Sequence, residues 1–491
     1  MLNLASLKTP GVYIDEIPKF PPSVAQVETA IPAFIGYTQK ARKDGEDVTM
    51  RPVRITSLLD FVEIFGEPQE EINIIVNFEQ QLDLGKIRKE IVTAEFDTSD
   101  GKGASKHVMY YALRAYFDNG GGPCWIVSIA PYIVEIGSQV LNGTLFGEGL
   151  DALEQIDEPT LIVFPEGQGM DVNDYYSLQV QSVQQCQKLQ DRFAVIDVFQ
   201  PNKTLSKSEK DIALTTFRNT MNISEVEFTK YSAAYFPNIK FSFEYTYSES
   251  AVKARFTQNN VPGDLQDFST LDNRQKSQAR GAIQSFPVCL PPSGAIVGIY
   301  ARVDSTRGVW KAPANESVFG AQDLTYRMND EEQAEFNVDV NAGKSVNVIR
   351  FFTGKGFKVW GARTLAGNDN EWRYVPVRRF FIMVEESVKK ATYQFVFEPN
   401  DINTWIKVRG MIENFLVLQW RAGALQGATP EKAFYVRVGL GETMTALDIL
   451  EGRMIVEIGM AGRTTAIPIS TIIRPSRMSK AVMVSPNPTR T

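Results

Sequence analysis

Histidine, the side chain most often used for acid–base catalysis and zinc binding near neutral pH, occurs once in the 491-residue chain, as His107. A hydrolytic triad with an imidazole base would therefore depend on this one residue. Its neighbours in the segment DGKGASKH (100–107) are mostly Gly, Lys and Ser, so the sequence predicts a solvated surface loop. Since no His, Cys, Asp and Glu residues have metal-site spacing either, we expect no catalytic residue, metal or cofactor.

Two glycine–lysine segments only partly match phosphate-binding loops. The segment NAGKS (341–345) ends as a P-loop ends, but Val338 occupies the position of the first motif glycine. In GKG (354–356), the third glycine of a dinucleotide fingerprint is replaced by Val359. The glycines at 120–122 follow an expected helix and precede an expected strand, the reverse of the order that presents a helix N-terminus to an anion. These segments predict turns and a helix end.

The acidic run Asp330-Glu331-Glu332 predicts the solvated start of a helix rather than a catalytic carboxylate pair. Overall, 43% of residues are hydrophobic, 22% are charged, and the net charge is −7. An acidic balance argues against nucleic acid as the principal partner, and the apolar runs are too short to span a membrane. Three scattered cysteines and a start without signal-peptide features indicate folding in a reducing cytoplasm, with no direct membrane insertion.

Strands and helices alternate through much of the chain before residue 365. Apolar runs at Ile31–Tyr37, Leu161–Phe164 and Phe193–Val198 are typical of strands buried on both faces. A helix expected over Tyr175–Leu189 lies between the last two, which is the βαβ pattern of a parallel sheet. Residues 200–285 are more polar and predict surface loops and a hairpin.

The last quarter of the chain predicts an α+β unit. Asn400 or Asp401 is placed to cap a helix that ends before Gly423, and apolar residues recur in this helix at helical spacing. Strands expected over Ala433–Val438 and Met454–Met460 follow it.

Both ends of the chain have the sequence character of extended arms. A short alternating run near the front is flanked by prolines, and the stretch Thr464–Ile473 is also extended. A lone strand cannot satisfy its own backbone hydrogen bonds, so each arm needs a sheet elsewhere. The arm side chains expected at such a sheet are Val12, Tyr13 and Ile14 at the front, and Ile467, Ile469 and Ile472 near the end.

Six segments together resemble the phage tail sheath family, which includes the sheaths of pyocins and of extracellular contractile injection systems. They occur in family order and cover most of the chain. They are TPGVYIDE (9–16), AIPAFIGYT (30–38), YFDNGGGPCWIV (116–127), PPSGAIVGIYARVDSTRGVWKAPAN (291–315), VNVIRFFTGKGFKVWGARTL (346–365) and FEPNDINTWIKVRGMIENFLVLQWRAGALQGATPEKAFYV (397–436).

The resemblance implies a multidomain protein of α/β and α+β class. It implies a subtilisin-like α/β middle domain without protease function, and an inner C-terminal α+β domain completed by strands from neighbouring subunits. The expected divisions are an N-terminal arm (1–22), an α/β segment packing with the inner domain (23–130), the middle or outer domain (131–365), the inner domain (366–463) and a C-terminal arm (464–491).

The resemblance also implies a structural, non-enzymatic role. The subunit would polymerise into a helical contractile sleeve around an inner tube and drive that tube through a target membrane, as part of a virion tail or a phage tail-like injection particle. Its partners would be copies of itself, the inner tube protein, and baseplate and terminator or cap proteins. Residues 401–491 carry 11 Lys and Arg against 7 Asp and Glu, and Lys407, Arg409 and Arg421 are the candidate tube-facing side chains.

Two alternatives stay open at this stage. One is a hydrolase on the subtilisin-like fold, which could use only His107 as its base. The other is a tube or baseplate component of the same kind of particle, although the chain length and the two extended ends argue against it.

Overall fold

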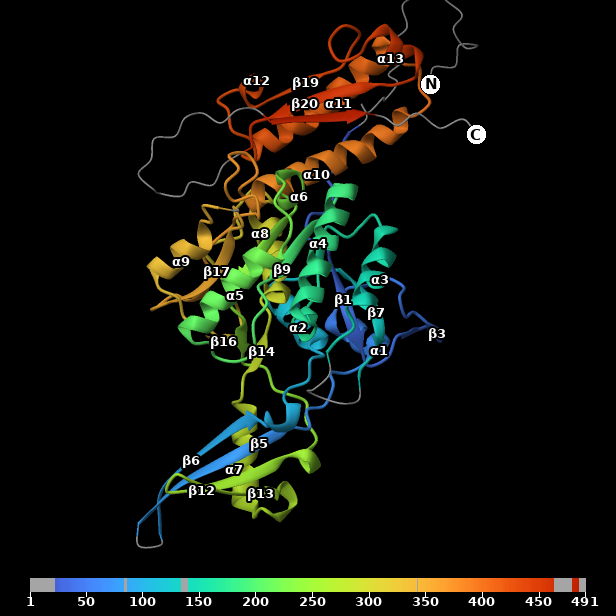
Figure 1. The fold of residues 1–491 in the computed structure, drawn as a ribbon. Coiled ribbons are helices and arrows are strands. Elements are labelled where there is room, and N and C mark those ends of the chain that lie inside the picture. Colours follow the sequence, from blue (N-terminus) through green and yellow to red (C-terminus); the bar gives the residue numbers. More distant parts are fainter. Residues whose placement is uncertain (1–22, 84–85, 134–139, 342, 463–478, 485–491) are drawn as a thin grey trace, which may run out of the picture. The chain divides into compact units, whose positions relative to one another are not determined.

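A computed structural model describes residues 23–83, 86–133, 140–341, 343–462 and 479–484 (Figure 1). The arm side chains predicted at 12–14 and 467–472 lie outside the described residues. The chain forms two compact units. The larger holds residues 28–383, and the smaller combines residues 23–27 with 384–462 and the strand at 479–484.

A nine-stranded sheet forms the centre of the larger unit, in the order β15-β18-β17-β10-β9-β8-β1-β7-β4. The strands from β17 to β7 run parallel, and antiparallel strands complete both edges. The βαβ prediction is confirmed, because α4 (Val172–Leu189) links the parallel strands β8 (Leu161–Val163) and β9 (Phe193–Asp197). The other strands of this sheet are β1 (Pro32–Thr38), β4 (Val53–Ile55), β7 (Cys124–Pro131), β10 (Ser232–Phe236), β15 (Glu316–Ser317), β17 (Val346–Phe352) and β18 (Gly356–Val359).

Helices pack on both faces of this sheet, which explains why its central strands are apolar throughout (Figure 1). α3 (Gly143–Glu154) and α4 pack together against one face, whereas α2 (Met109–Asp118) and α8 (Ser293–Arg307) pack together against the other. α1 (Leu58–Phe65) is capped by Ser57, whose side chain accepts the N–H of Asp60, and it ends at Gly66. α2 ends just before the glycines at 120–122, so the predicted helix end is confirmed.

The prediction of surface loops over residues 200–285 was wrong except for the hairpin. α5 (Lys207–Thr220) and β10 lie in this stretch, and β10 is paired on both sides inside the nine-stranded sheet. The acidic run at 330–332 does start a helix, α9 (Asp330–Asn337), where Asn329 and Glu332 form a capping box. Shorter elements are the β2–β3 hairpin (Arg42–Lys43, Glu46–Asp47), α6 (Val226–Thr229) and the sheet β14-β11-β16 (Val288–Leu290, Ile239–Phe241, Ala321–Leu324).

A four-stranded sheet with its own small core joins two segments that are far apart in sequence. β5 (Ile74–Asp83) and β6 (Lys86–Phe96) form one hairpin, and β12 (Lys253–Gln258) and β13 (Val261–Asp267) form the other. β5 and β12 pair in parallel, and α7 (Asn273–Gln284) packs against β5 and β6.

The smaller unit is the α+β unit expected for the last quarter. α10 (Val375–Thr392) crosses the unit boundary after Met383 and is followed by α11 (Ile402–Arg421), which packs on β19. The sheet has the order β19-β20-β21. Its elements are α12 (Pro430–Ala433), β19 (Phe434–Arg437), α13 (Ala446–Leu450), β20 (Ile455–Met460) and β21 (Ser479–Val484).

The two units divide the chain differently from the expected domains. The segment 23–130, expected to pack with the inner domain, contributes β1, β4 and β7 to the nine-stranded sheet of the larger unit. The two compact units divide at 383/384, inside α10, and the domain boundary expected at 365/366 stays a prediction. Adjacent pairing of β1 with β8 is the physical reason that residues 23–130 belong to the larger unit, because it joins the two segments in one sheet.

Candidate functional site

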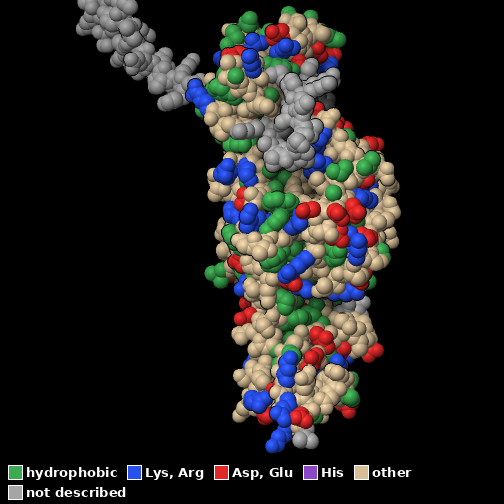
Figure 2. Space-filling view, turned by 90° about the vertical axis from the view of Figure 1, so that its left-hand side faces the viewer, with side chains coloured by type: hydrophobic (Ala, Val, Ile, Leu, Met, Phe, Trp, Pro, Cys, Tyr) green, Lys and Arg blue, Asp and Glu red, His purple; other side chains and the backbone are tan. Residues whose placement is uncertain are grey.

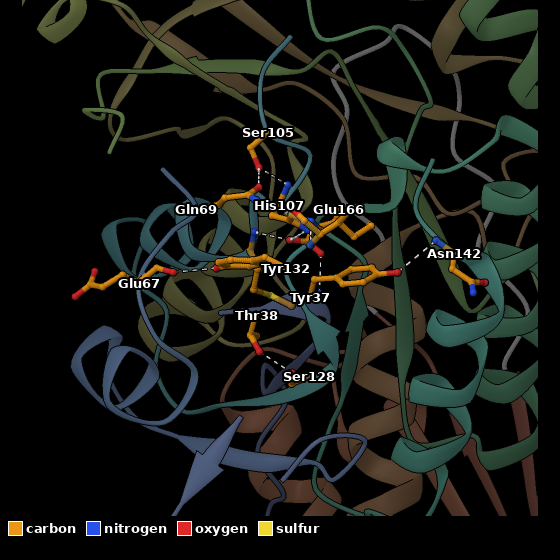
Figure 3. Close-up of polar contacts among 12 residues, drawn as sticks. Tyr37, Thr38, Glu67, Gln69, Ser105, His107, Ser128, Tyr132, Asn142 and Glu166 are labelled. Atoms are coloured by element: carbon orange, nitrogen blue, oxygen red, sulfur yellow. Dashed lines mark hydrogen bonds and ion pairs between the residues drawn. The ribbon is translucent and has the colours of Figure 1, made fainter. Parts of the chain in front are cut away.

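A buried polar cluster lies at the carboxyl ends of β1 and β8 (Figure 3). β1 has β7 on one side and β8 on the other, and open α/β sheets tend to bind ligands where the strand order reverses in this way. Tyr37 comes from β1, Glu166 follows β8, His107 precedes α2, and Tyr132 follows β7. The fold therefore brings the single histidine to a position where α/β proteins often place chemistry.

His107 is only 4% exposed, so the prediction of a solvated surface residue was wrong. Its ring lies between Tyr37 and Tyr132, at centroid distances of 5.0 and 4.9 Å. Nε2 accepts the backbone N–H of Ile133 at 3.1 Å, and Nδ1 is 3.6 Å from Oε1 of Glu166. The burial comes from partners distant in sequence, which the Gly- and Lys-rich neighbourhood of His107 does not reveal.

Glu166 is held by backbone donors from two elements. Its carboxylate accepts the N–H of Tyr37 at 2.7 Å and the N–H of Met109 at 3.3 Å. A buried carboxylate needs such donors because it has lost its hydration. A Cβ atom at Gly36 would lie 2.8 Å from Oε2 of Glu166, so the absence of a side chain at Gly36 leaves room for this carboxylate.

A second buried carboxyl group, that of Glu71, is connected to His107 through hydrogen bonds of Ser105. The N–H of Ser105 donates to both carboxyl oxygens of Glu71, at 3.1 and 3.0 Å. Oγ of Ser105 donates to Gln69 at 2.5 Å and accepts the backbone N–H of His107 at 3.0 Å. Burial raises the pKa of Glu71 to about 8, and the hydrogen bond from Ser105 offsets this only in part. At neutral pH this carboxyl group is therefore mostly protonated.

Among the described residues, the cluster offers no activated nucleophile. Nε2 of His107 is occupied by a backbone N–H and Nδ1 faces Glu166, so neither nitrogen is bonded to a hydroxyl or thiol group. Burial raises the pKa of the thiol groups of Cys124, Cys186 and Cys289, the opposite of the shift that makes a reactive thiolate. The geometry fits a packing and hydrogen-bonding role and gives the hydrolase alternative no support.

A cavity of about 600 Å³ opens beside this cluster, lined by residues that follow β8, β9 and β10. The amide groups in its lining bond to one another. Asn238 Oδ1 accepts from Gln168 Nε2 at 3.1 Å and from Gln200 Nε2 at 2.6 Å, and Asn238 Nδ2 donates to Gln168 Oε1 at 2.8 Å. Because these amides satisfy one another, they specify no ligand.

The remaining chemical candidates have structural roles. Lys344, in the segment that partly matches a P-loop, is buried, and its Nζ donates to the carbonyl oxygens of Arg218, at 2.8 Å, and of Met221. Across the described ranges, no group of three His, Cys, Asp or Glu side chains could hold a metal ion. Of the helices described, none is both long enough and apolar enough to cross a membrane.

α11 carries the three predicted tube-facing side chains, and it begins at Asp401, which accepts the N–H groups of residues 403 and 404. Lys407 and Arg421 are exposed, and their separation of fourteen positions places them within about 40° on one helix face. Arg409 points elsewhere: it is half-buried and donates to the Val438 carbonyl at 2.9 Å and to Glu442 at 2.7 Å. The structure therefore places two of the three residues on one face of α11.

β21 gives the smaller unit a strand from near the end of the chain. All six residues of β20 pair with β21, and its residues 457–460 also pair with β19. The expected C-terminal arm (464–491) includes Ser479–Val484, but its strand was expected around Ile467–Ile472, so β21 itself was missed. The apolar residues of AVMV (481–484) were the available signal.

Charged side chains of both signs are interspersed on the face shown in Figure 2, with no single basic stripe that would follow a phosphate backbone there. Two family models match the chain in consecutive ranges. The phage tail sheath protein central domain matches residues 149–365, and the phage tail sheath C-terminal domain matches residues 367–460. Together they cover more than half of the 491 residues.

The chain belongs to the phage tail sheath protein family.

Solved sheath structures match along nearly the whole chain. A PVC sheath complex of an extracellular contractile injection system, in the contracted state, is 27% identical with a TM-score of 0.60, covering 96% of this chain and 98% of that one. The helical sheath of the anti-feeding prophage in the contracted state is 28% identical with a TM-score of 0.61, covering 96% and 100%. A chain of the six-fold symmetrised baseplate of the same particle is 28% identical with a TM-score of 0.59, covering 96% and 100%. No curated protein matches the sheath chain.

These matches confirm the resemblance found in the sequence: the chain is a structural sheath protein, and its solved relatives include sheaths of contractile injection systems. The described fold is a mixed α/β multidomain architecture with several sheets, consistent with that of the matched sheaths. The subtilisin-like description of the middle domain and the exchange of terminal strands stay predictions.

Proposed function

We propose that this sheath protein polymerises into a helical contractile sleeve around an inner tube, and that its contraction drives the tube through a target membrane. The support comes from two relatives matched over 96% of the chain, one described as a helical sheath and both in a contracted state. An extended sleeve that is metastable releases free energy when its subunits move into larger contacts, so no nucleotide is required. The backbone-bonded role of Lys344 is consistent with that mechanism.

The observation that carries this proposal is the place of β21 in the sheet of the smaller unit. A strand donated from the chain terminus is joined to β20 by main-chain pairing, the same bonding that a strand from another copy would use. Residues 461–478 separate the two strands in sequence, and eighteen residues can span at most about 60 Å. In the sleeve, we propose that a linker of this reach allows the position to be filled by exchange between subunits.

The N-terminal arm has a possible site in the same sheet. Among the described residues, no strand pairs with the outer edge of β19. We propose that an arm strand containing Val12, Tyr13 and Ile14 from a neighbouring subunit adds to the sheet by main-chain pairing. A contact of this kind joins different surfaces of successive subunits, so its repetition around an axis builds a helix rather than a closed ring.

The exposed face of α11 is the proposed contact with the inner tube. Lys407 and Arg421 lie on that face, and Ile406 and Leu418 beside them are 63% and 60% exposed. An acidic tube surface would be complementary to this face. We place baseplate proteins and a terminator or cap protein at the two ends of the sleeve, and its assembly in the bacterial cytoplasm before it becomes part of a virion tail or an injection particle.

Charge reversal on α11 tests the tube contact. Lys407→Glu with Arg421→Glu should abolish sleeves on co-produced inner tubes, because both charges on the proposed contact face change sign. Lys432→Glu, which reverses an exposed charge on α12 of the same unit, is the matched control and should leave sleeves intact. Electron microscopy of the particles measures the outcome. Tube-bound sleeves of normal abundance from the double variant would remove α11 as the contact, and discrete monomers from the unaltered chain beside inner tubes would contradict the sleeve itself.

A further inference from the structure

One buried ion pair in the larger unit lies next to two points at which the chain passes between the units. The unit boundaries fall after Val27 and after Met383. Thr29 is two residues beyond the first boundary, and Arg379 is four residues before the second. Both contact Asp304 of α8, so segments that are 350 residues apart in sequence meet at one carboxylate.

The geometry of this cluster is closely defined. Arg379 Nη2 lies 2.6 Å from Asp304 Oδ2 and Nη1 lies 3.1 Å from Oδ1, which is a two-point pairing of guanidinium and carboxylate. Thr29 Oγ1 donates to Asp304 Oδ2 at 2.6 Å, and its carbonyl oxygen accepts from Arg379 Nη2 at 2.7 Å. The guanidinium carbon of Arg379 lies 4.4 Å from the ring centroid of Tyr300.

The two charged side chains are 3% and 7% exposed. A buried ion pair often stabilises a fold no more than apolar residues of the same size would, because both charges lose their hydration. An arginine–carboxylate pair does fix the relative orientation of its two side chains. The planar guanidinium group forms two parallel hydrogen bonds to a carboxylate only within a narrow range of orientations, whereas the ammonium group of a lysine has no such restriction. The cluster is therefore better explained by the geometry it fixes than by the stability it adds.

We propose that Thr29, Asp304 and Arg379 form an anchor that fixes both chain crossings to α8, so that a movement of the larger unit is passed directly to the N-terminal arm and to α10. This inference rests on the proposed contractile function. Asp304 and Arg379 are positioning residues in this anchor, since they act through the segments that they hold.

The test compares two buried carboxylates of the larger unit in the full-length sheath protein. Asp304→Asn removes the charge from the anchor. Glu166→Gln is the matched control, because Glu166 also accepts two N–H donors but binds the carboxyl end of β1, away from residue 29. Both variants should unfold at a lower temperature, because each replaces a buried carboxylate that accepts short hydrogen bonds from N–H donors. The unfolding temperature therefore reports only the contribution of each carboxylate to stability and does not test the anchor.

Hydrogen exchange in the unassembled chain distinguishes an anchor at the two crossings from a general contribution to stability. In Asp304→Asn, the amides of residues 23–31 and 384–392 should exchange at least about tenfold faster than in the unaltered chain, because the crossings open locally. In Glu166→Gln, exchange in these segments should not change. On inner tubes, Asp304→Asn sleeves should form but lose contraction when triggered, as scored by electron microscopy.

Equal exchange in both variants at residues 23–31 and 384–392, or normal contraction of Asp304→Asn sleeves, would overturn the anchor. If Asp304→Asn does not fold, Arg379→Lys keeps the charge but removes the two-point pairing and takes its place in every measurement. If the unaltered chain forms no sleeves at all, the proposed function fails, and the exchange experiment still decides whether the crossings are anchored.

Discussion

Two carboxyl groups of the larger unit are buried without a cationic partner among their hydrogen bonds. Glu71 accepts the N–H of Ser105, and Asp197, the last residue of β9, accepts the N–H of Ser293 at 2.8 Å. Burial raises the pKa of Glu71 to about 8 and that of Asp197 to about 7. Both groups therefore hold protons in the folded state that they would release on unfolding at neutral pH.

The raised pKa of Glu71 makes the free energy of unfolding depend on pH. The folded pKa of Glu71 lies above its ordinary value of 4.5, so its contribution is complete below about pH 4.5 and is lost as the pH rises towards about 8. Glu71→Gln has no proton to lose and should become more stable than the unaltered chain across that window, by roughly 2 kcal/mol or more at pH 8.

Urea unfolding at a series of pH values measures this difference, with Asp197→Asn as the control. The gain in Asp197→Asn should level off near pH 7 rather than near pH 8, because its folded pKa is lower. A stability difference between Glu71→Gln and the unaltered chain that does not change with pH would show that Glu71 is ionised in the folded protein.

His107→Ala should lower the free energy of unfolding by about 2–4 kcal/mol. The substitution removes the ring packed between Tyr37 and Tyr132 and leaves the N–H of Ile133 without its acceptor. Well below its unfolding temperature, the variant should still form sleeves. Thermal unfolding and electron microscopy check the two parts, and an unchanged unfolding temperature would contradict the packing role.

At the scale of elements, strands were predictable where burial on both faces left an apolar run, as in β8 and β9. β10 was missed because SAAYF (232–236) begins with three small residues and carries a weak apolar signal. The four-stranded sheet could not be predicted, since its two hairpins, at 74–96 and 253–267, pair only in the folded chain. The candidate cluster could not be predicted for the same reason. His107 was evident as the single histidine, but Tyr37, Tyr132 and Glu166 come to surround it only in the folded chain.

β21 is the element whose removal bears most directly on the arms. A chain ending at residue 478 loses every main-chain bond that β21 makes to β20, so it should fold but fail to form ordered sleeves. A chain ending at residue 484 keeps β21 and should assemble normally. Sedimentation and electron microscopy measure both. Ordered sleeves from the shorter chain would show that this strand does not hold the subunits together.

For the whole molecule, the smaller unit supplies a sheet that terminal strands can complete, and the larger unit supplies a body built on the nine-stranded sheet. The family matches indicate a structural role for this arrangement, because relatives matched over 96% of the chain are described as sheaths in a contracted state. In the proposed sleeve, terminal strands would allow the bodies to move while the chain connections between neighbours persist. The family and the mixed α/β class were accessible from the sequence because the matching segments span most of the chain, whereas the placing of residues 23–130 in the larger unit depends on strand pairing that the sequence does not show.

In the proposed function, copies of this chain build a helical sleeve through their terminal arms. The deciding experiment is negative-stain electron microscopy of the full chain, produced alone, beside a chain lacking residues 1–22. We expect hollow, ridged helical tubes from the full chain and their loss in the shortened one. Tubes that form equally well without residues 1–22 would contradict the arm mechanism, and discrete monomers from both chains, even with inner-tube protein added, would contradict the sleeve.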